Sequence, residues 1–125
     1  MNNKKKGSDF EKKLCEILAK DGYWVHFMSP NNKGAQPFDI IAVRNGHAIA
    51  GDCKTCESHI FRLSRAEDNQ ILAFEKWVAC GNGDPYFFVE HDGKVYFIRY
   101  WEMKKHGKVD LDKRVEQCIL ESETK

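Results

Sequence analysis

Two aspartates and one lysine are spaced so that they could meet at the open end of a β-hairpin. Apolar, β-favouring residues flank Asn45-Gly46, a dipeptide that supplies both positive φ angles of a type I′ turn. Counting outward from this turn pairs Asp39 with Asp52, and Lys54 returns to the same face two residues later. Facing carboxylates repel unless a cation neutralises them, so the pattern predicts a Mg²⁺ site that also accepts phosphate. An ordinary Asp–Lys pair at an exposed strand end is the alternative.

Local patterns predict the elements that position these residues. A capping box at Ser8-Asp9-Phe10-Glu11 would begin a helix that stops at Gly22, and a second one over residues 64–67 would begin a helix that stops at Gly81. A strand over 23–28 should lie next to the hairpin, and Asp92-Gly93 should join two aromatic-rich strands. Terminal helices are expected near Trp101 and over the segment from Leu111 to Ile119. The order predicts an α/β fold with a mixed sheet flanked by helices.

The same residues carry a resemblance to a known family. Asp39, a spacer and then Asp52-x-Lys54 resemble the signature of the PD-(D/E)xK nuclease superfamily, although Pro37-Phe38-Asp39 has one inserted residue. Together with Glu11, Gly22-Tyr23 and Gln70, the chain from about Gly7 to Tyr100 resembles Holliday-junction resolvases of the archaeal and Gram-positive type. Asp52 stands where those enzymes more often carry Glu.

This resemblance implies a restriction-endonuclease-like sheet and a catalytic set. It implies Mg²⁺, with Mn²⁺ as a substitute, and the expected metal ligands are Asp39, Asp52, Glu11 and the main-chain carbonyl of Cys53. Lys54 would orient the attacking water or stabilise the charge that develops on the phosphate, and Gln70 would position that phosphate. Two simpler interpretations stay open, because Glu11 could act only as a helix cap and Gln70 could be an ordinary surface residue. The implied substrate is branched, four-way DNA, and the implied assembly is a homodimer.

Further residues are candidates for DNA contacts. The resemblance places a serine near the scissile phosphate, matched here by Ser29, and the basic candidates are Lys33, Arg62, Arg65 and the N-terminal Lys4, Lys5 and Lys6. We expect residues 1–6 to form a disordered basic tail and residues 7–125 to form one domain. Residues 1–65 contain 11 Lys and Arg against 7 Asp and Glu, while residues 66–125 contain 9 against 12, so the half with the proposed site is the basic one.

The composition of the chain indicates where in the cell the protein works. The net charge is +1, no apolar run is long enough to cross a membrane, and the first residues lack the apolar stretch of a signal peptide. Five cysteines form no regular framework, which favours free thiols in a reducing compartment. We therefore expect a soluble cytoplasmic protein without a membrane partner.

Three other functions remain open. The chain could be another PD-(D/E)xK endonuclease, acting in repair, restriction or phage processing. It could also be a nucleic-acid-binding module of this fold without catalysis. Finally, Cys53-x-x-Cys56, followed by His59, could form a redox or zinc site, although no second ligand pair accompanies it.

Overall fold

The computed structural model describes residues 3–28 and 38–120 of the 125-residue chain, without the side chains of residues 3–8. Its helices, strands and 3₁₀ turns are α1 (Asn3–Lys20), β1 (Trp24–Phe27), β2 (Ile40–Arg44), β3 (His47–Thr55), β4 (Ile60–Arg62), η1 (Leu63–Arg65), α2 (Asp68–Ala79), β5 (Tyr86–His91), β6 (Lys94–Arg99), α3 (Tyr100–His106), β7 (Lys108–Asp110), η2 (Leu111–Lys113) and β8 (Cys118–Ile119).

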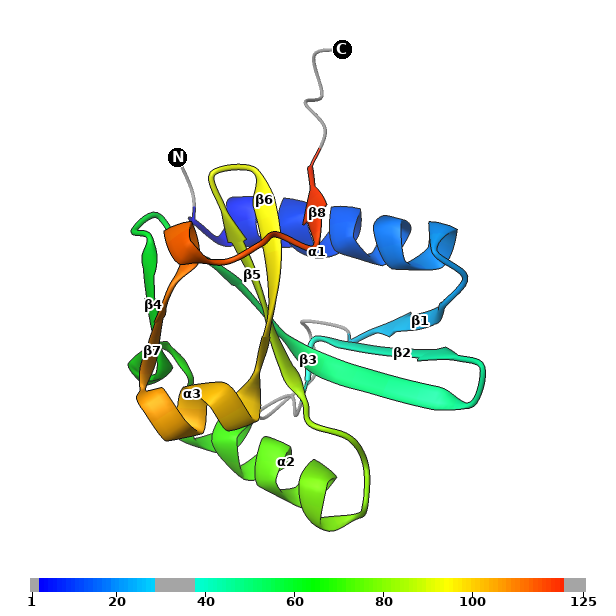
Figure 1. Ribbon diagram of the computed structural model, residues 1–125. Coiled ribbons are helices and arrows are strands. Elements are labelled where there is room, and N and C mark those ends of the chain that lie inside the picture. The colour runs from blue at the N-terminus through cyan, green and yellow to red at the C-terminus, as the bar shows by residue number, and fades with distance from the viewer. Residues whose placement is uncertain (1–2, 29–37, 121–125) are drawn as a thin grey trace.

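A mixed sheet with the strand order β1-β2-β3-β5-β6-β8 forms the centre of the fold (Figure 1). β3 and β5 pair in parallel, whereas the other neighbours in this sheet are antiparallel. Strands β4 and β7 form a separate two-stranded sheet. The predicted mixed sheet flanked by helices is therefore confirmed, and β1 lies next to the hairpin as expected.

The register of the hairpin is the predicted one. Asn45 and Gly46 have φ angles of 53° and 77°, as a type I′ turn requires. The pairing begins with Arg44 opposite His47 and continues to Ile40 opposite Gly51. One step further along this ladder places Asp39, just before β2, opposite Asp52.

The central sheet separates two hydrophobic clusters. On one face, α1 packs through Phe10, Leu14 and Leu18 against residues that include Ile40 and Phe88. On the other face, α2, α3 and the small β4–β7 sheet cover the strands, and their buried residues are Phe61, Phe74, Tyr100, Met103, Val109 and Leu111. Figure 1 shows α1 on the opposite side of the sheet from α2 and α3. Because successive residues of β3 face opposite clusters, this strand can present side chains to both layers.

Both predicted helix starts were wrong. Helix α1 begins at Asn3 rather than near Ser8, so residues 3–6 are helical where we expected a disordered tail. Helix α2 begins at Asp68, and its capping box consists of Glu67 and Gln70, whereas Ser64 lies in the preceding 3₁₀ turn. At α1 the helix-favouring lysines before Ser8 extend the helix toward the N-terminus. At α2 the Glu-x-x-Gln spacing of Glu67 and Gln70 determines the start.

The chain after α3 also differs from the prediction. The expected second terminal helix is absent from the described residues, and the segment forms β7, η2 and the two-residue strand β8 instead. β7 pairs with β4 and β8 pairs with β6, so both depend on partners far away in the sequence. A short strand whose pairing is long-range leaves little local signal.

Gly51 allows β3 and β5 to pack closely beside the acidic residues. A Cβ atom at this position would lie 2.2 Å from the main-chain oxygen of Tyr86 and 2.8 Å from the ring of Phe88. We expect Gly51→Ala to lower the free energy of unfolding by about 3 kcal/mol, because backbone rather than a flexible side chain would have to move. Urea unfolding of the metal-free protein measures this change.

Gly83→Ala is the matched control for this variant. A Cβ atom at Gly83 would meet nothing within 4 Å, so the unfolding midpoint should change little. Equal midpoints for the two variants would contradict the close approach of β3 and β5.

None of the helices in the described part of the chain is both long enough and apolar enough to span a membrane.

Candidate active site

The side chain of Asp39 joins the two strands of the hairpin where they separate. Its Oδ2 accepts a hydrogen bond of 2.8 Å from the main-chain N–H of Cys53, and its own N–H donates to the carbonyl of Gly51. Asp39 is thereby held beside β3 although it precedes β2. The geometry places one carboxylate oxygen in a fixed position at the end of the hairpin.

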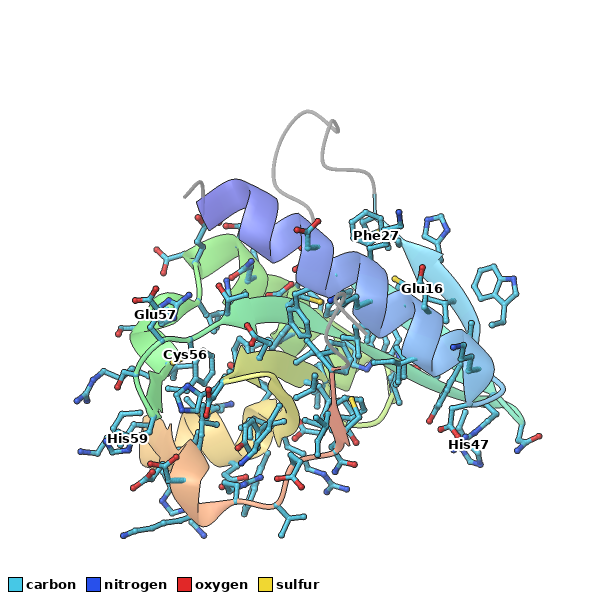
Figure 2. All side chains as sticks on the ribbon, turned by 90° about the horizontal axis from the view of Figure 1, so that it is seen from above. Glu16, Phe27, His47, Cys56, Glu57 and His59 are labelled. Carbon is cyan, nitrogen blue, oxygen red and sulfur yellow. The ribbon has the colours of Figure 1, made fainter. Side chains whose placement is uncertain are left out.

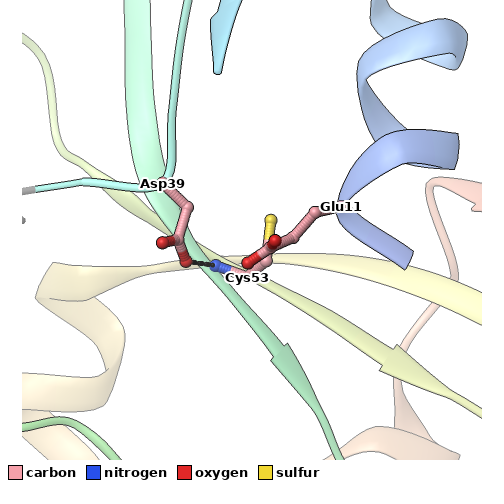
Figure 3. Close-up of side chains that lie close together, drawn as sticks. All are labelled: Glu11, Asp39 and Cys53. Atoms are coloured by element: carbon pink, nitrogen blue, oxygen red, sulfur yellow. Dashed lines mark hydrogen bonds between the residues drawn. The ribbon is translucent and has the colours of Figure 1, made fainter. Parts of the chain in front are cut away.

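Helix α1 brings a second carboxylate to this point. The side-chain ligand atoms of Glu11, Asp39 and Cys53 all lie within 4.8 Å of one another. Figure 3 shows Glu11 reaching from α1 toward Asp39 and Cys53. Glu11 sits in the interior of α1, so it is not the cap of this helix. The interpretation in which Glu11 faces the hairpin acids is therefore the one that the geometry supports.

Asp52 occupies the face of β3 opposite to Cys53. Its side chain is 1% exposed, and neither carboxylate oxygen has a hydrogen-bond partner among the described residues. Burial, together with the charge of Asp39, raises the pKa of Asp52 to about 8, although Lys54 acts in the opposite direction. A buried carboxyl group without a partner is unfavourable, and a bound cation would supply the missing interaction.

The other two acids also resist ionisation. Burial raises the pKa of Glu11 to about 7, and the neighbouring charge of Asp39 adds to this effect. Burial likewise raises the pKa of Asp39, whereas the Cys53 N–H and Lys54 lower it. Raised pKa values for three carboxyl groups that act on one another, through Asp39, are typical of a functional site rather than of a structural ion pair.

These donors fit a hard divalent cation. Carboxylate oxygens are the ligands that Mg²⁺ and Mn²⁺ prefer. Burial raises the pKa of the Cys53 thiol well above its usual value, so this group stays neutral and does not provide the thiolate that a soft metal selects. Glu11 and Asp39 cluster tightly, whereas Asp52 lies outside the group whose atoms are all within 4.8 Å.

Lys54 and Gln70 meet on the same face as Asp52. The Nζ of Lys54 donates a hydrogen bond of 3.0 Å to the Oε1 of Gln70, and both side chains are half-buried. The same Oε1 accepts from the N–H of Glu67 in the capping box of α2. Gln70 therefore connects the start of α2 to Lys54, which is a more specific position than an ordinary surface residue has.

The family resemblance implies DNA cleavage, and on that expectation Gln70→Ala should reduce the cleavage rate by about tenfold to a hundredfold, because Lys54 would lose the contact that fixes its ammonium group. The loss of the capping box should lower stability by about 1 kcal/mol. Single-turnover cleavage rates and thermal unfolding separate the two effects. Asn69→Ala, in the same turn of α2, should leave the rate within a factor of about two.

One residue near this site was missed by the sequence analysis. The carboxylate of Glu67 contributes to the raised pKa of Asp52, so it lies close enough to act on the cluster. We expected Glu67 to close a capping box with Ser64, but it is itself the N-cap residue. The Glu-x-x-Gln spacing of Glu67 and Gln70 is the signal that could have identified it.

The predicted DNA contacts are only partly within the described residues. Arg62 and Arg65 are exposed, and Arg65 donates to the carbonyl of Thr55, the last residue of β3. This contact keeps Arg65 near the strand that carries Asp52 and Lys54. Ser29 and Lys33 lie outside the described residues, as do the side chains of Lys4, Lys5 and Lys6.

Cys53 and Cys56 do not form a joint site. Cys53 packs in the cluster under α1, whereas Cys56 is buried in the cluster on the other face of the sheet. The thiol of Cys56 lies 3.0 Å from the carbonyl oxygen of Ser58, and both cysteines are free. The geometry therefore gives no support to a redox or zinc pair made of these two residues.

Comparisons with known proteins identify the family of this chain. The family model described as archaeal Holliday junction resolvase (Hjc) matches residues 2–123. A crossover junction endodeoxyribonuclease Hjc from Methanocaldococcus jannaschii is 28% identical over 118 residues, which cover 94% of this chain and 84% of the relative. The structure of Archaeoglobus fulgidus Hjc, a Holliday junction resolvase, has a similar fold, with a TM-score of 0.64 and 19% identity over 90% of this chain and 92% of the other.

The mixed sheet flanked by helices, together with the matching family model and the M. jannaschii relative, defines the class of this protein as an endodeoxyribonuclease. Within that class, the chain belongs to the archaeal Holliday junction resolvase family, Hjc.

Proposed function

We propose that this protein is a Mg²⁺-dependent endonuclease that cleaves four-way DNA junctions. The observation that carries the proposal is the close pair of Glu11 and Asp39, next to Asp52 on the same strand end, whose buried carboxylate has no hydrogen-bond partner among the described residues. Membership of the Hjc family supports the substrate class. The M. jannaschii relative is named a crossover junction endodeoxyribonuclease, which is the same reaction.

Each residue has a distinct task in this proposal. Asp39, Asp52 and Glu11 would hold the metal ion, and the main-chain carbonyl of Cys53 would complete the protein ligands. When bound, Mg²⁺ supplies an activated water molecule and neutralises charge on the phosphate. The Lys54 ammonium would donate hydrogen bonds to that water or to a phosphate oxygen while the bond to the leaving sugar oxygen breaks. Gln70 would hold Lys54 in place through the 3.0 Å contact between them.

The test is the cleavage of a labelled four-way junction beside a linear duplex of the same sequence. Both are incubated with Mg²⁺, with EDTA, and with Lys54→Ala in place of the wild type. Paired cuts confined to the junction would support a resolvase. Cutting of both substrates would indicate a nuclease with another role in repair, restriction or phage processing, and metal-independent binding without cutting would indicate a binding module.

A homodimer is part of the proposal, because paired cuts on a four-way junction need two active sites. Exposed apolar side chains support it: Trp101 is 59% exposed, Val115 86% and Ile119 64%. Light scattering at micromolar concentration should give twice the mass of one chain. We place the protein in the cytoplasm, where its five free cysteines would remain reduced.

DNA would approach the face on which β3 ends. Arg62 and Arg65 are exposed beside this strand and would contact phosphates. Ser29, Lys33 and the N-terminal Lys4, Lys5 and Lys6 remain candidates for the same role. Phosphate contacts of this kind should make binding weaken steeply as the salt concentration rises.

A further inference from the structure

A second group of metal-ligating side chains lies away from the acids at the hairpin. His59, just before β4, meets Asp110 at the end of β7 and Asp112 in η2, and their ligand atoms all lie within 4.8 Å of one another. The Nδ1 of His59 is 2.9 Å from Asp110 Oδ1 and 3.8 Å from Asp112 Oδ2. In a tetrahedral zinc site with ligand bonds of about 2.0–2.2 Å, neighbouring ligand atoms are about 3.4 Å apart. The observed spacings lie on either side of that value.

A second histidine lies beside this group, next to Asp112, although it is outside the set whose ligand atoms are all within 4.8 Å of one another. The Nε2 of His91, at the end of β5, lies 3.9 Å from Asp112 Oδ1. Its other ring nitrogen, Nδ1, is 2.9 Å from the carbonyl oxygen of Cys56. Because a carbonyl only accepts hydrogen bonds, Nδ1 carries a proton, and Nε2 is the ring nitrogen that faces Asp112. A histidine ligand of zinc is commonly oriented by such a contact to a main-chain carbonyl.

The main chain holds the two aspartates and His59 together. Ile60 pairs with Asp110 in the β4–β7 sheet, and the N–H of Leu111 donates to the carbonyl of His59 at 2.7 Å. The N–H of Asp112 donates to Asp110 Oδ1, which keeps both aspartates on one turn. The arrangement does not depend on flexible side chains alone.

We propose that His59, His91, Asp110 and Asp112 bind a zinc ion that joins the β4–β7 sheet to β5. Two imidazoles and two carboxylates make a neutral complex with a divalent cation. Imidazole ligands favour zinc over Mg²⁺, which prefers oxygen donors, so this site and the acids around Asp39 select different metals. About half of the His59 side chain and two thirds of the Asp112 side chain are exposed, so an ion can reach both from solvent.

The ion would stabilise the segment that follows the catalytic strand. Cys56, two residues after Lys54, is bonded through its carbonyl to His91 and through its N–H to the carbonyl of Glu90. Zinc at His91 would add a further connection between this segment and β5. We therefore expect zinc to raise the thermal midpoint of the full chain.

The test measures zinc bound per chain by equilibrium dialysis and elemental analysis, with Mg²⁺ in excess so that the acids around Asp39 are occupied. Wild type should bind about one zinc ion, and His59→Ala and Asp112→Asn should each weaken binding at least about tenfold. Both changed residues are exposed, so the variants should fold. His47→Ala is the matched control, since Figure 2 shows His47 on the far side of the molecule from His59.

Cobalt in place of zinc identifies the ligands. Co²⁺ at this site should show tetrahedral d–d absorption without a sulfur charge-transfer band, because no cysteine belongs to the proposed set. A sulfur band, or binding that Cys53→Ala removes and His59→Ala leaves intact, would assign the ion to the other cluster and overturn the proposal. If the wild type binds no zinc, the proposal is wrong, and His59, Asp110 and Asp112 form only a His–Asp ion pair.

Discussion

Lys54→Met should slow cleavage of a four-way junction by about a thousandfold and leave junction binding within a factor of about three. Methionine keeps the length of the side chain but removes the ammonium group. In the proposed reaction this group acts on charge that develops as the phosphodiester breaks, so its loss affects the chemical step more than binding. Single-turnover rates with saturating enzyme, together with gel-shift titrations in Ca²⁺, measure the two quantities separately.

Lys76→Met is the matched control for this prediction. Lys76 is an exposed lysine of α2, the helix that also carries Gln70, and it makes no contact with the acids among the described residues. Its replacement should change neither the rate nor the binding. A Lys54→Met enzyme that cleaves at the wild-type rate would show that the ammonium group has no catalytic task, even if the fold and the metal site are as described.

The Lys54→Met variant should also bind Mg²⁺ differently, for an electrostatic reason. Lys54 lowers the pKa values of Glu11, Asp39 and Asp52, so without it these acids should bind protons more tightly. Protons then compete more strongly with the metal ion. At pH 7 the Lys54→Met protein should need more Mg²⁺ for half-saturation than the wild type, and this difference should shrink as the pH rises.

Turn chemistry explains how far the sequence predicts this site. Asn45-Gly46 determines the turn, the turn determines the register, and the register places Asp39 opposite Asp52. These are local relations over a few residues. The 2.8 Å hydrogen bond from Cys53 to Asp39 and the contact between Lys54 and Gln70 depend instead on tertiary packing, and only the family resemblance pointed to Gln70.

Long-range contacts account for most of what the sequence did not predict. His59 meets Asp110, a residue 51 positions later, because β4 and β7 pair, and neither strand has a strong local signal. The predictions of the two helix starts were wrong for a different reason. At α1 and α2 two capping or propensity patterns overlap within a few residues, and local sequence does not rank them.

Asp52→Asn should make the metal-free protein more stable than the wild type at alkaline pH. Asp52 has a pKa of about 8 in the folded state against 3.8 for the unperturbed side chain. Between these values the folded protein keeps a proton that the unfolded chain has released, so the wild type loses stability as the pH rises from about 4 to about 8. Asparagine has the same shape and no charge, and it removes this dependence.

The expected gain is on the order of 3 kcal/mol at pH 8 and above, which corresponds to roughly 10 °C in the thermal midpoint. At pH 4 the two proteins should differ little, since Asp52 is then protonated in the folded state and half-protonated in the unfolded chain. Thermal unfolding of both proteins in EDTA at pH values from 4 to 9 measures the difference. Glu11, whose pKa is raised to about 7, should leave a smaller pH dependence in the variant.

Mg²⁺ should reverse the order of the two proteins. The ion binds ionised carboxylates, so at pH 8 it should stabilise the wild type by an amount that grows with its concentration, and it should stabilise Asp52→Asn far less. The same variant should cleave no junction DNA. If Asp52→Asn is less stable than the wild type in EDTA at pH 9, the buried carboxyl group has a partner that offsets its charge, and the argument that it awaits a cation fails. Asp92→Asn, at the exposed turn of the β5–β6 hairpin, serves as the control, because its change should be small and independent of both pH and Mg²⁺.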